Sequence, residues 1–160
     1  MGLCAGNNLM LVGLNAMLML LCFLLNRRSV LAFWFCNFDG TFLATKCDSF
    51  AGGFGAREAE AFGVQEALSW LKNLRLPRVV IELNCLQAFK VLTENRSSPN
   101  GFGLIIEECR FLAQNFREVE FSIVRQYANA AAHSVARVEG SMSCPREWSI
   151  VPPCWSLNNL

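Results

Sequence analysis

The sequence has few charged residues and a single histidine. Lysine and arginine number 14, aspartate and glutamate 13, and these charged residues make up 17% of the 160 positions, below the usual quarter. The formal charge of +1 shows no basic excess of the kind that marks a dedicated nucleic-acid binder. A hydrophobic content of 53% excludes disorder, and the length suits one domain. Net charge therefore identifies no partner.

The eight cysteines lack the spacing of a zinc site. No C-x-x-C pair occurs, and no neighbouring histidine completes a ligand set for a structural zinc ion. Cys22, Cys36, Cys85 and Cys109 stand among apolar neighbours, where cysteine behaves as a small hydrophobe. We therefore expect buried thiols in a reducing intracellular compartment rather than a disulfide framework.

Charged side chains are absent before Arg27, and the run Leu9–Leu25 is strongly apolar. As a helix it would just span a bilayer, which needs about 17 to 25 residues, and Arg27 and Arg28 would then form the cytosolic flank of a membrane anchor. As a signal peptide it lacks a basic start and a small-residue cleavage pattern. The alternative that we favour is a segment buried in the domain, or an atypical start of the chain.

From residue 31 onward, strand-like and helical patterns alternate. A hairpin is expected from residues 31–37 and 41–47 around the turn Phe38-Asp39-Gly40. The later elements are expected as a helix at 57–74, a strand at 78–83, helices at 85–93 and 102–116, a strand at 119–124 and a helix at 130–139. This order predicts one α/β domain with a mixed sheet over residues 31–140. The head, 1–30, precedes it, and the tail, 141–160, has no period and is expected to lie over the surface or to be loose.

Five segments of this domain share their order and spacing with a known family. They are NFDGTFLATK at Asn37–Lys46, AREAEAFGVQEALSWLK at Ala56–Lys72, VVIELNCLQAFKVL at Val79–Leu92, FGLIIEEC at Phe102–Cys109 and IVRQYANAAAHSVAR at Ile123–Arg137. Together they resemble the plant branch of the ribonuclease H type-1 family, also described as reverse-transcriptase-like. The resemblance implies a mixed five-stranded sheet with helices on both faces, the second strand antiparallel to its neighbours. It also implies hydrolysis of the RNA strand of an RNA–DNA hybrid by two magnesium ions held on four acidic residues.

The resemblance assigns the four acidic positions of the family to residues of this chain. Glu60 matches the glutamate near the start of the first helix and is the one metal-binding carboxylate retained. Asn84 stands where an acid ends the following strand, and His133 stands where an acid opens the last helix. For the acid of the first strand only Asn15 lies at a plausible distance, and it is neutral. The first strand is therefore expected to be missing or atypical.

One carboxylate in place of four predicts weak magnesium binding and impaired two-metal catalysis. Each missing carboxylate forfeits about 8 kcal/mol of attraction to a divalent ion at about 4 Å, with an effective dielectric constant of about 20. Imidazole is also a poor magnesium ligand. Other roles stay open: Glu60 as a solvated acid in the first turn of its helix, Asn84 as the cap of a helix that begins at Cys85, and His133 as a helix-surface residue.

Three hypotheses follow from the sequence. The first is a nucleic-acid-binding ribonuclease H-like domain related to hybrid endonucleases, with little or no activity. The second is a non-catalytic interaction module, tethered to a membrane through Leu9–Leu25 or free of it. The third is a fragment that has lost its first strand.

Overall fold

The computed structural model describes residues 15–25, 28–51, 54–94, 99–124 and 146–149. The elements are, in chain order, β1 (Asn15–Leu25), β2 (Arg28–Asn37), β3 (Phe42–Ala51), α1 (Ala56–Asn73), β4 (Arg78–Leu83), α2 (Leu86–Thr93), α3 (Gly101–Ala113), β5 (Glu118–Ile123) and β6 (Arg146–Ser149). The predicted strands and helices between residues 31 and 124 are thus all present, close to their expected bounds. The helix expected at 130–139 lies outside the described residues.

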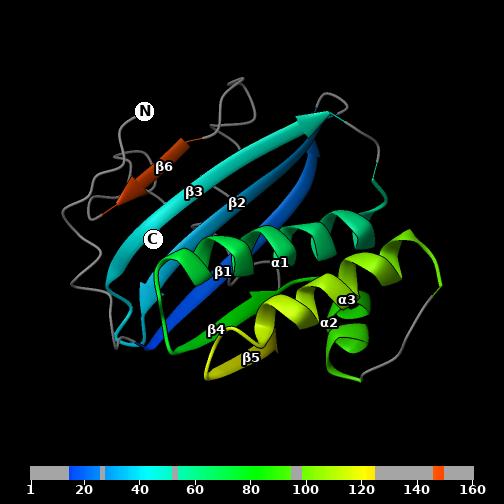
Figure 1. Cartoon of the computed structure of the whole chain (residues 1–160). Coiled ribbons are helices and arrows are strands. Elements are labelled where there is room, and N and C mark those ends of the chain that lie inside the picture. Colours follow the sequence, from blue (N-terminus) through cyan, green and yellow to red (C-terminus); the bar gives the residue numbers. More distant parts are fainter. Residues whose placement is uncertain (1–14, 26–27, 52–53, 95–98, 125–145, 150–160) are drawn as a thin grey trace.

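The strands form one mixed sheet in the order β5-β4-β1-β2-β3-β6 (Figure 1). The second strand, β2, runs antiparallel to both of its neighbours, β1 and β3, whereas β1, β4 and β5 are parallel. Strands β1 to β5 therefore make the mixed five-stranded sheet that the sequence predicts, and β6 extends it past β3.

The first strand is present and lies near the middle of the sheet. Residues 15–25 of the apolar run pair with β2 on one side and with β4 on the other. A continuous apolar run is typical both of a bilayer helix and of a strand in the interior of a sheet, so the residue pattern alone does not separate the two. The expectation of a missing first strand is therefore wrong, and so is a helical membrane anchor that includes residues 15–25. Among the described residues, none of the helices has the length and apolar character to cross a membrane.

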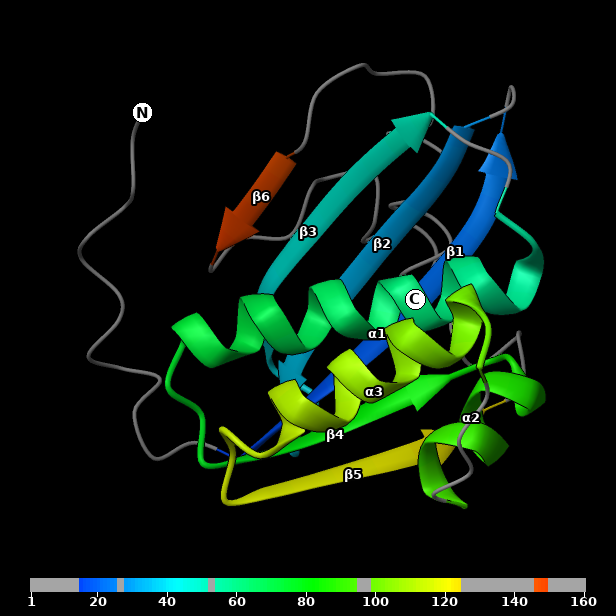
Figure 2. The ribbon, with the colours of Figure 1, turned by 45° about the vertical axis from the view of Figure 1, so that its right-hand side comes forward.

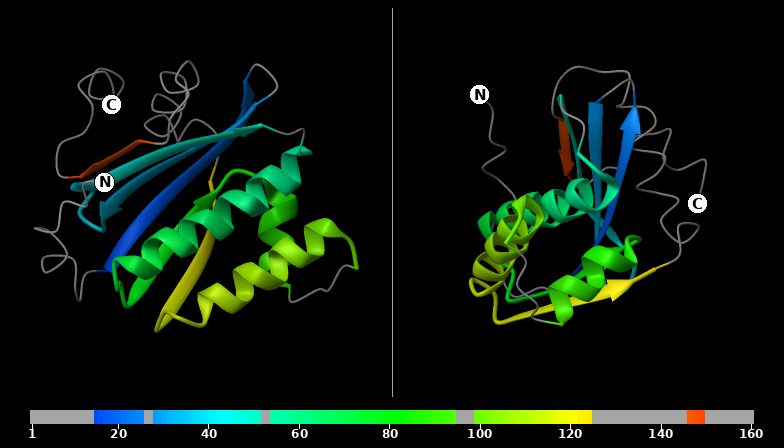
Figure 3. Two further views of the ribbon diagram at one scale, coloured as in Figure 1. Left: turned by 45° about the horizontal axis from the view of Figure 1, so that its top comes forward. Right: turned by 90° about the vertical axis from the view of Figure 1, so that its right-hand side faces the viewer.

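The helices α1 and α3 lie side by side over one face of the sheet (Figures 2 and 3). The predicted apolar face of α1 is confirmed, because Ala61, Val64, Leu68 and Leu71 are all fully buried. They pack in one core with residues of the sheet, among them Leu18 of β1. Helices on the opposite face would depend on the expected helix at 130–139, so this part of the fold stays a prediction.

The hairpin of β2 and β3 turns at the expected Asp-Gly pair. Gly40 has a φ of 81°, a left-handed conformation that favours glycine. The side-chain oxygen of Asn37 accepts hydrogen bonds from the backbone N–H groups of Asp39 and Thr41, which closes the turn. The turn chemistry that the sequence indicated therefore sets the register of these strands.

Strand β6 corrects the expectation for the tail. Arg146–Ser149 pair antiparallel with Cys47–Ala44 of β3, so these four residues belong to the sheet. A strand at the edge of a sheet presents unpaired N–H and C=O groups that a further segment can occupy. The sequence of the tail shows no strand period, and the pairing with the edge of β3 is not visible in it.

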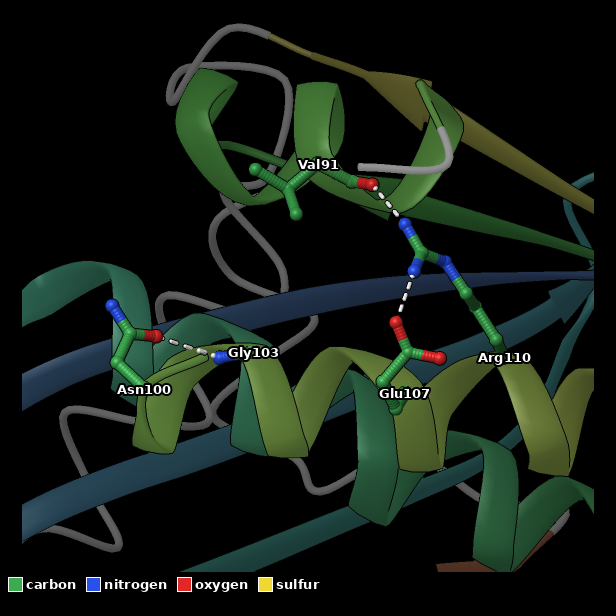
Figure 4. Close-up of polar contacts among 5 residues, drawn as sticks. All are labelled: Val91, Asn100, Gly103, Glu107 and Arg110. Atoms are coloured by element: carbon green, nitrogen blue, oxygen red, sulfur yellow. Dashed lines mark hydrogen bonds and ion pairs between the residues drawn. The ribbon is translucent and has the colours of Figure 1, made fainter. Parts of the chain in front are cut away.

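Polar contacts fix α3 at its start and against α2 (Figure 4). The side-chain oxygen of Asn100 accepts a hydrogen bond from the backbone N–H of Gly103 and caps α3. Arg110 donates from Nη2 to the backbone oxygen of Val91 in α2 at 2.8 Å and from Nη1 to Glu107 at 2.6 Å. The side chain of Arg110 therefore links the two helices.

Four cysteines are free thiols, Cys36, Cys47, Cys85 and Cys109, and the expectation for Cys22 stays a prediction. Cys36, Cys47 and Cys109 are buried, and Cys85 is half-buried. Burial is the main reason why the pKa of Cys36 is raised to about 11 and that of Cys109 to about 12. These thiols are therefore protonated at neutral pH and behave as apolar core groups.

Candidate functional site

The carboxyl end of β4, the start of α2 and the first turns of α1 lie at the same end of the molecule (Figure 2). Glu60 is the fifth residue of α1, and Asn84 directly follows β4. The backbone N–H of Asn84 donates a hydrogen bond to Oε1 of Glu60 at 3.2 Å. Two of the predicted site residues, 24 positions apart in the chain, are thus in direct contact.

Glu60 is a buried carboxyl group. Its exposed fraction is 2%, and the acid in the first turn of α1 is Glu58. Burial raises the pKa of Glu60 from its ordinary 4.5 to about 7, while hydrogen bonds from the backbone N–H groups of Asn84 and Cys85 oppose that rise. The alternative of a solvated first-turn acid is therefore wrong, and near neutral pH this group exchanges between its charged and neutral forms.

Asn84 does not cap α2. The N-cap residue is Cys85, and no side chain makes a cap hydrogen bond there. Instead, the carboxyl group of Glu60 binds the backbone N–H groups that precede the helix. The side chain of Asn84 is half-buried and makes no hydrogen bond within the part of the chain that the structure describes.

Asn15 lies away from this pair, and the structure does not describe His133. Asn15 opens β1, which runs parallel to β4, and it pairs with Arg78 at the start of that strand. Asn84 lies six residues after Arg78, which corresponds to about 20 Å along the strand direction at about 3.3 Å per residue. Asn15 is therefore at the opposite end of the sheet, and β1 carries no acidic residue. His133 lies outside the described residues.

Glu82 is a second carboxyl group near Asn84, which the sequence reasoning missed. It is half-buried, and burial raises its pKa. Val79, Ile81 and Leu83 of β4 belong to the core beneath the helices, so the alternation of the strand places Glu82 on the other face. The sequence signal that could have identified Glu82 is its position as the one acidic residue in the apolar run RVVIEL. Because the sheet separates it from Glu60, Glu82 does not complete a ligand pair with that residue.

The model of a family described as reverse transcriptase-like matches residues 25–138. The chain belongs to the reverse transcriptase-like family. The predicted resemblance is confirmed at this level, and the plant branch stays a prediction. No curated protein matches the sequence of this reverse transcriptase-like chain significantly.

Solved structures share the fold of this reverse transcriptase-like domain. RNase H1 from Halobacterium salinarum has a TM-score of 0.71 at 15% identity, covering 79% of this chain and 97% of its own. The N-terminal RNase H domain of a Mycobacterium tuberculosis protein, in a fusion with maltose-binding protein, has a TM-score of 0.70 at 14% identity, covering 81% and 95%. LC11-RNase H1, in complex with an RNA/DNA hybrid, has a TM-score of 0.69 at 12% identity, covering 80% and 99%. The predicted ribonuclease H fold is confirmed.

The described residues of the reverse transcriptase-like domain do not fit a pair of magnesium ions. Among the residues that the structure describes, no group of three or more His, Cys, Asp and Glu side chains is placed to hold a metal ion. Glu60 supplies one carboxylate, and Asn84 supplies an uncharged amide. Magnesium prefers charged oxygen ligands, so this part of the site offers it little.

Proposed function

We propose that this chain is a nucleic-acid-binding ribonuclease H-like domain that binds RNA–DNA hybrids and cleaves them weakly or not at all. The observation that carries the proposal is the contact of buried Glu60 with the backbone of Asn84, at the end of β4 where the family resemblance locates the site. The family match and the fold shared with an RNase H1 bound to an RNA/DNA hybrid support binding of the same class of ligand.

The charge of the described site argues against efficient hydrolysis. Four carboxylates would offset the four positive charges of two magnesium ions, whereas Glu60 offsets at most one. Its pKa of about 7 further reduces the charged fraction at neutral pH. The described residues at this end of the molecule therefore offer only weak attraction for divalent ions.

The test of this function uses the full chain, because a fragment that begins at Arg27 would lack β1. Binding of a labelled RNA–DNA hybrid is measured by fluorescence anisotropy, and cleavage is followed in magnesium and in manganese, with Glu60→Gln beside the wild type. We expect binding in both proteins and little cleavage in either. A folded wild-type chain that does not bind the hybrid would overturn the proposal.

A gain-of-ligand variant tests the charge argument. Asn84→Asp adds a carboxylate next to Glu60, and we expect magnesium to raise the melting temperature of this variant more than that of the wild type. Gln87→Glu is the matched control, since it adds the same charge at an exposed position in α2. An equal magnesium effect in both variants would mean that position 84 does not face a metal site.

A non-catalytic interaction module is the second candidate. Leu104 and Phe111 of α3 are 73% and 61% exposed, and a separation of seven residues puts them on one side of the helix. Exposed apolar side chains on one helix surface are typical of protein contacts. A folded chain that binds no nucleic acid would favour this function.

A further inference from the structure

Three phenylalanine rings form a cluster where the chain enters α1. Phe50 lies near the end of β3, Phe54 lies two residues before α1, and Phe62 lies in that helix. The ring centroids are 4.8 Å apart for Phe50 and Phe62, 5.5 Å for Phe50 and Phe54, and 5.9 Å for Phe54 and Phe62. Phe54 keeps an exposed fraction of 41% although two rings pack against it.

The packing of the three rings leaves part of Phe54 exposed. Its plane is 12° from that of Phe62, so these two rings are stacked, while Phe50 meets both of them edge-on. At a centroid separation of 5.9 Å the two near-parallel rings are offset, and Phe54 keeps 41% of its surface exposed beside them. Because two neighbours already hold the ring, a planar ligand that stacks on it loses little affinity to ordering the side chain.

The cluster lies at the end of α1 that carries the candidate site. Gly55, the N-cap of α1, directly follows Phe54, and Glu60 is the fifth residue of the helix. Arg57, in the first turn, contributes little free positive charge here, because its Nε is 2.7 Å from Oε1 of Glu58 and its guanidinium lies over the ring of Phe102. This end of α1 therefore offers a ligand an aromatic contact with Phe54 rather than an ion pair with Arg57.

We propose that Phe54 is a stacking platform for an unpaired base next to the bound hybrid, an inference that rests on the proposed function. Bases inside a duplex already stack on their neighbours, so only an unpaired base presents a free face to an aromatic side chain. Stacking of this kind tolerates any base, because every base has a π-face. Phe54 thus selects hybrids with a single-stranded extension over blunt hybrids.

The experiment compares the full-length wild type with Phe54→Ala on two labelled hybrids, one blunt and one with a single-stranded overhang. We expect Phe54→Ala to weaken binding of the overhang hybrid by about five- to a hundredfold and to leave the blunt hybrid unchanged. Phe54→Trp should retain the wild-type preference. The salt dependence of binding should not change, because no phosphate contact is removed.

Phe38→Ala is the matched control. Phe38 is also exposed, at 49%, but it lies in the β2–β3 turn beside Arg78, at the opposite end of β4 from Asn84. Its removal should leave both affinities unchanged. Equal binding of the overhang hybrid by wild type and Phe54→Ala, or equal losses on both hybrids, would overturn the stacking inference alone. A wild-type chain that binds neither hybrid would overturn the proposed function as well.

Discussion

Burial gives the Glu60 carboxyl group a protonation equilibrium that should be visible in the stability of the whole chain. Its pKa is about 7 in the folded protein and ordinarily 4.5, so the folded state binds a proton more tightly than the unfolded state. The free energy of unfolding is then highest below the unfolded pKa and falls as the pH rises through the folded one. Between about pH 4.5 and 7 the loss amounts to about 3 kcal/mol, at about 1.4 kcal/mol per pKa unit.

Replacing Glu60 with glutamine should remove this dependence. The amide keeps the size of the side chain and does not titrate, so we expect Glu60→Gln to be more stable than the wild type at pH 8 and to show a flatter pH profile. Urea unfolding at several pH values measures both. Glu58→Gln is the control, because hydrogen bonding to Arg57 lowers the pKa of Glu58 and its stabilising effect is lost toward low pH instead. An unchanged profile in Glu60→Gln would contradict the assignment of the titration to this group.

The sequence assigned Glu60 and Asn84 to one site, and the structure brings these two residues into contact. The family register assigned both residues to the site, and their contact depends on the tertiary structure, in which the first turns of α1 lie beside the end of β4. The sequence offered no acid for the first strand, and the parallel pairing of β1 with β4 places Asn15, the only residue at a plausible distance, at the far end of the sheet. The prediction that Asn84 caps α2 is wrong, because the N-cap is Cys85 and the backbone N–H of Asn84 donates a hydrogen bond to Glu60.

Strand β1 is the element whose assignment matters most for the fold. Leu18 is fully buried in the core shared with the helices. Truncation of a buried leucine to alanine costs about 2 to 5 kcal/mol, so we expect Leu18→Ala to lower the free energy of unfolding by that amount. Urea unfolding measures it. Leu104→Ala removes an exposed leucine from α3 and should change stability by no more than about 0.5 kcal/mol. Equal effects of the two substitutions would mean that β1 does not belong to the core.

The elements differ in how well the sequence defines them. Helix α1 and strand β4 were predicted closely, because their buried residues repeat with the period of one helix face or as one short apolar run. An apolar run without a period, such as β1, fits a buried strand and a membrane helix equally well. Strand β6 has no pattern of its own, and its pairing depends on the open edge of β3.

At the scale of the whole molecule, a formal charge of +1 limits the attraction for nucleic acid to local contacts. Phosphate contacts release counterions, so binding that uses even a few of them weakens steeply with salt. We expect the affinity of the full chain for an RNA–DNA hybrid to fall by about tenfold or more between about 50 and 200 mM salt. Anisotropy titrations at several salt concentrations measure the slope. An affinity that does not change with salt would be incompatible with backbone recognition.

The sequence by itself determined the family and the α/β order of the elements from residue 31 to 124, because local periodicity and motif spacing encode them. The assignment of Glu60 and Asn84 to the site came from the family resemblance and stays a prediction. The tertiary structure decided three things: that the apolar run at 15–25 is a central strand, that Asn15 lies far from the site, and that Glu60 is buried enough to raise its pKa. Each of these depends on which segments pair or pack together. Such contacts join residues distant in the chain, and their energies are set by burial and strand register, which no local pattern of residues contains.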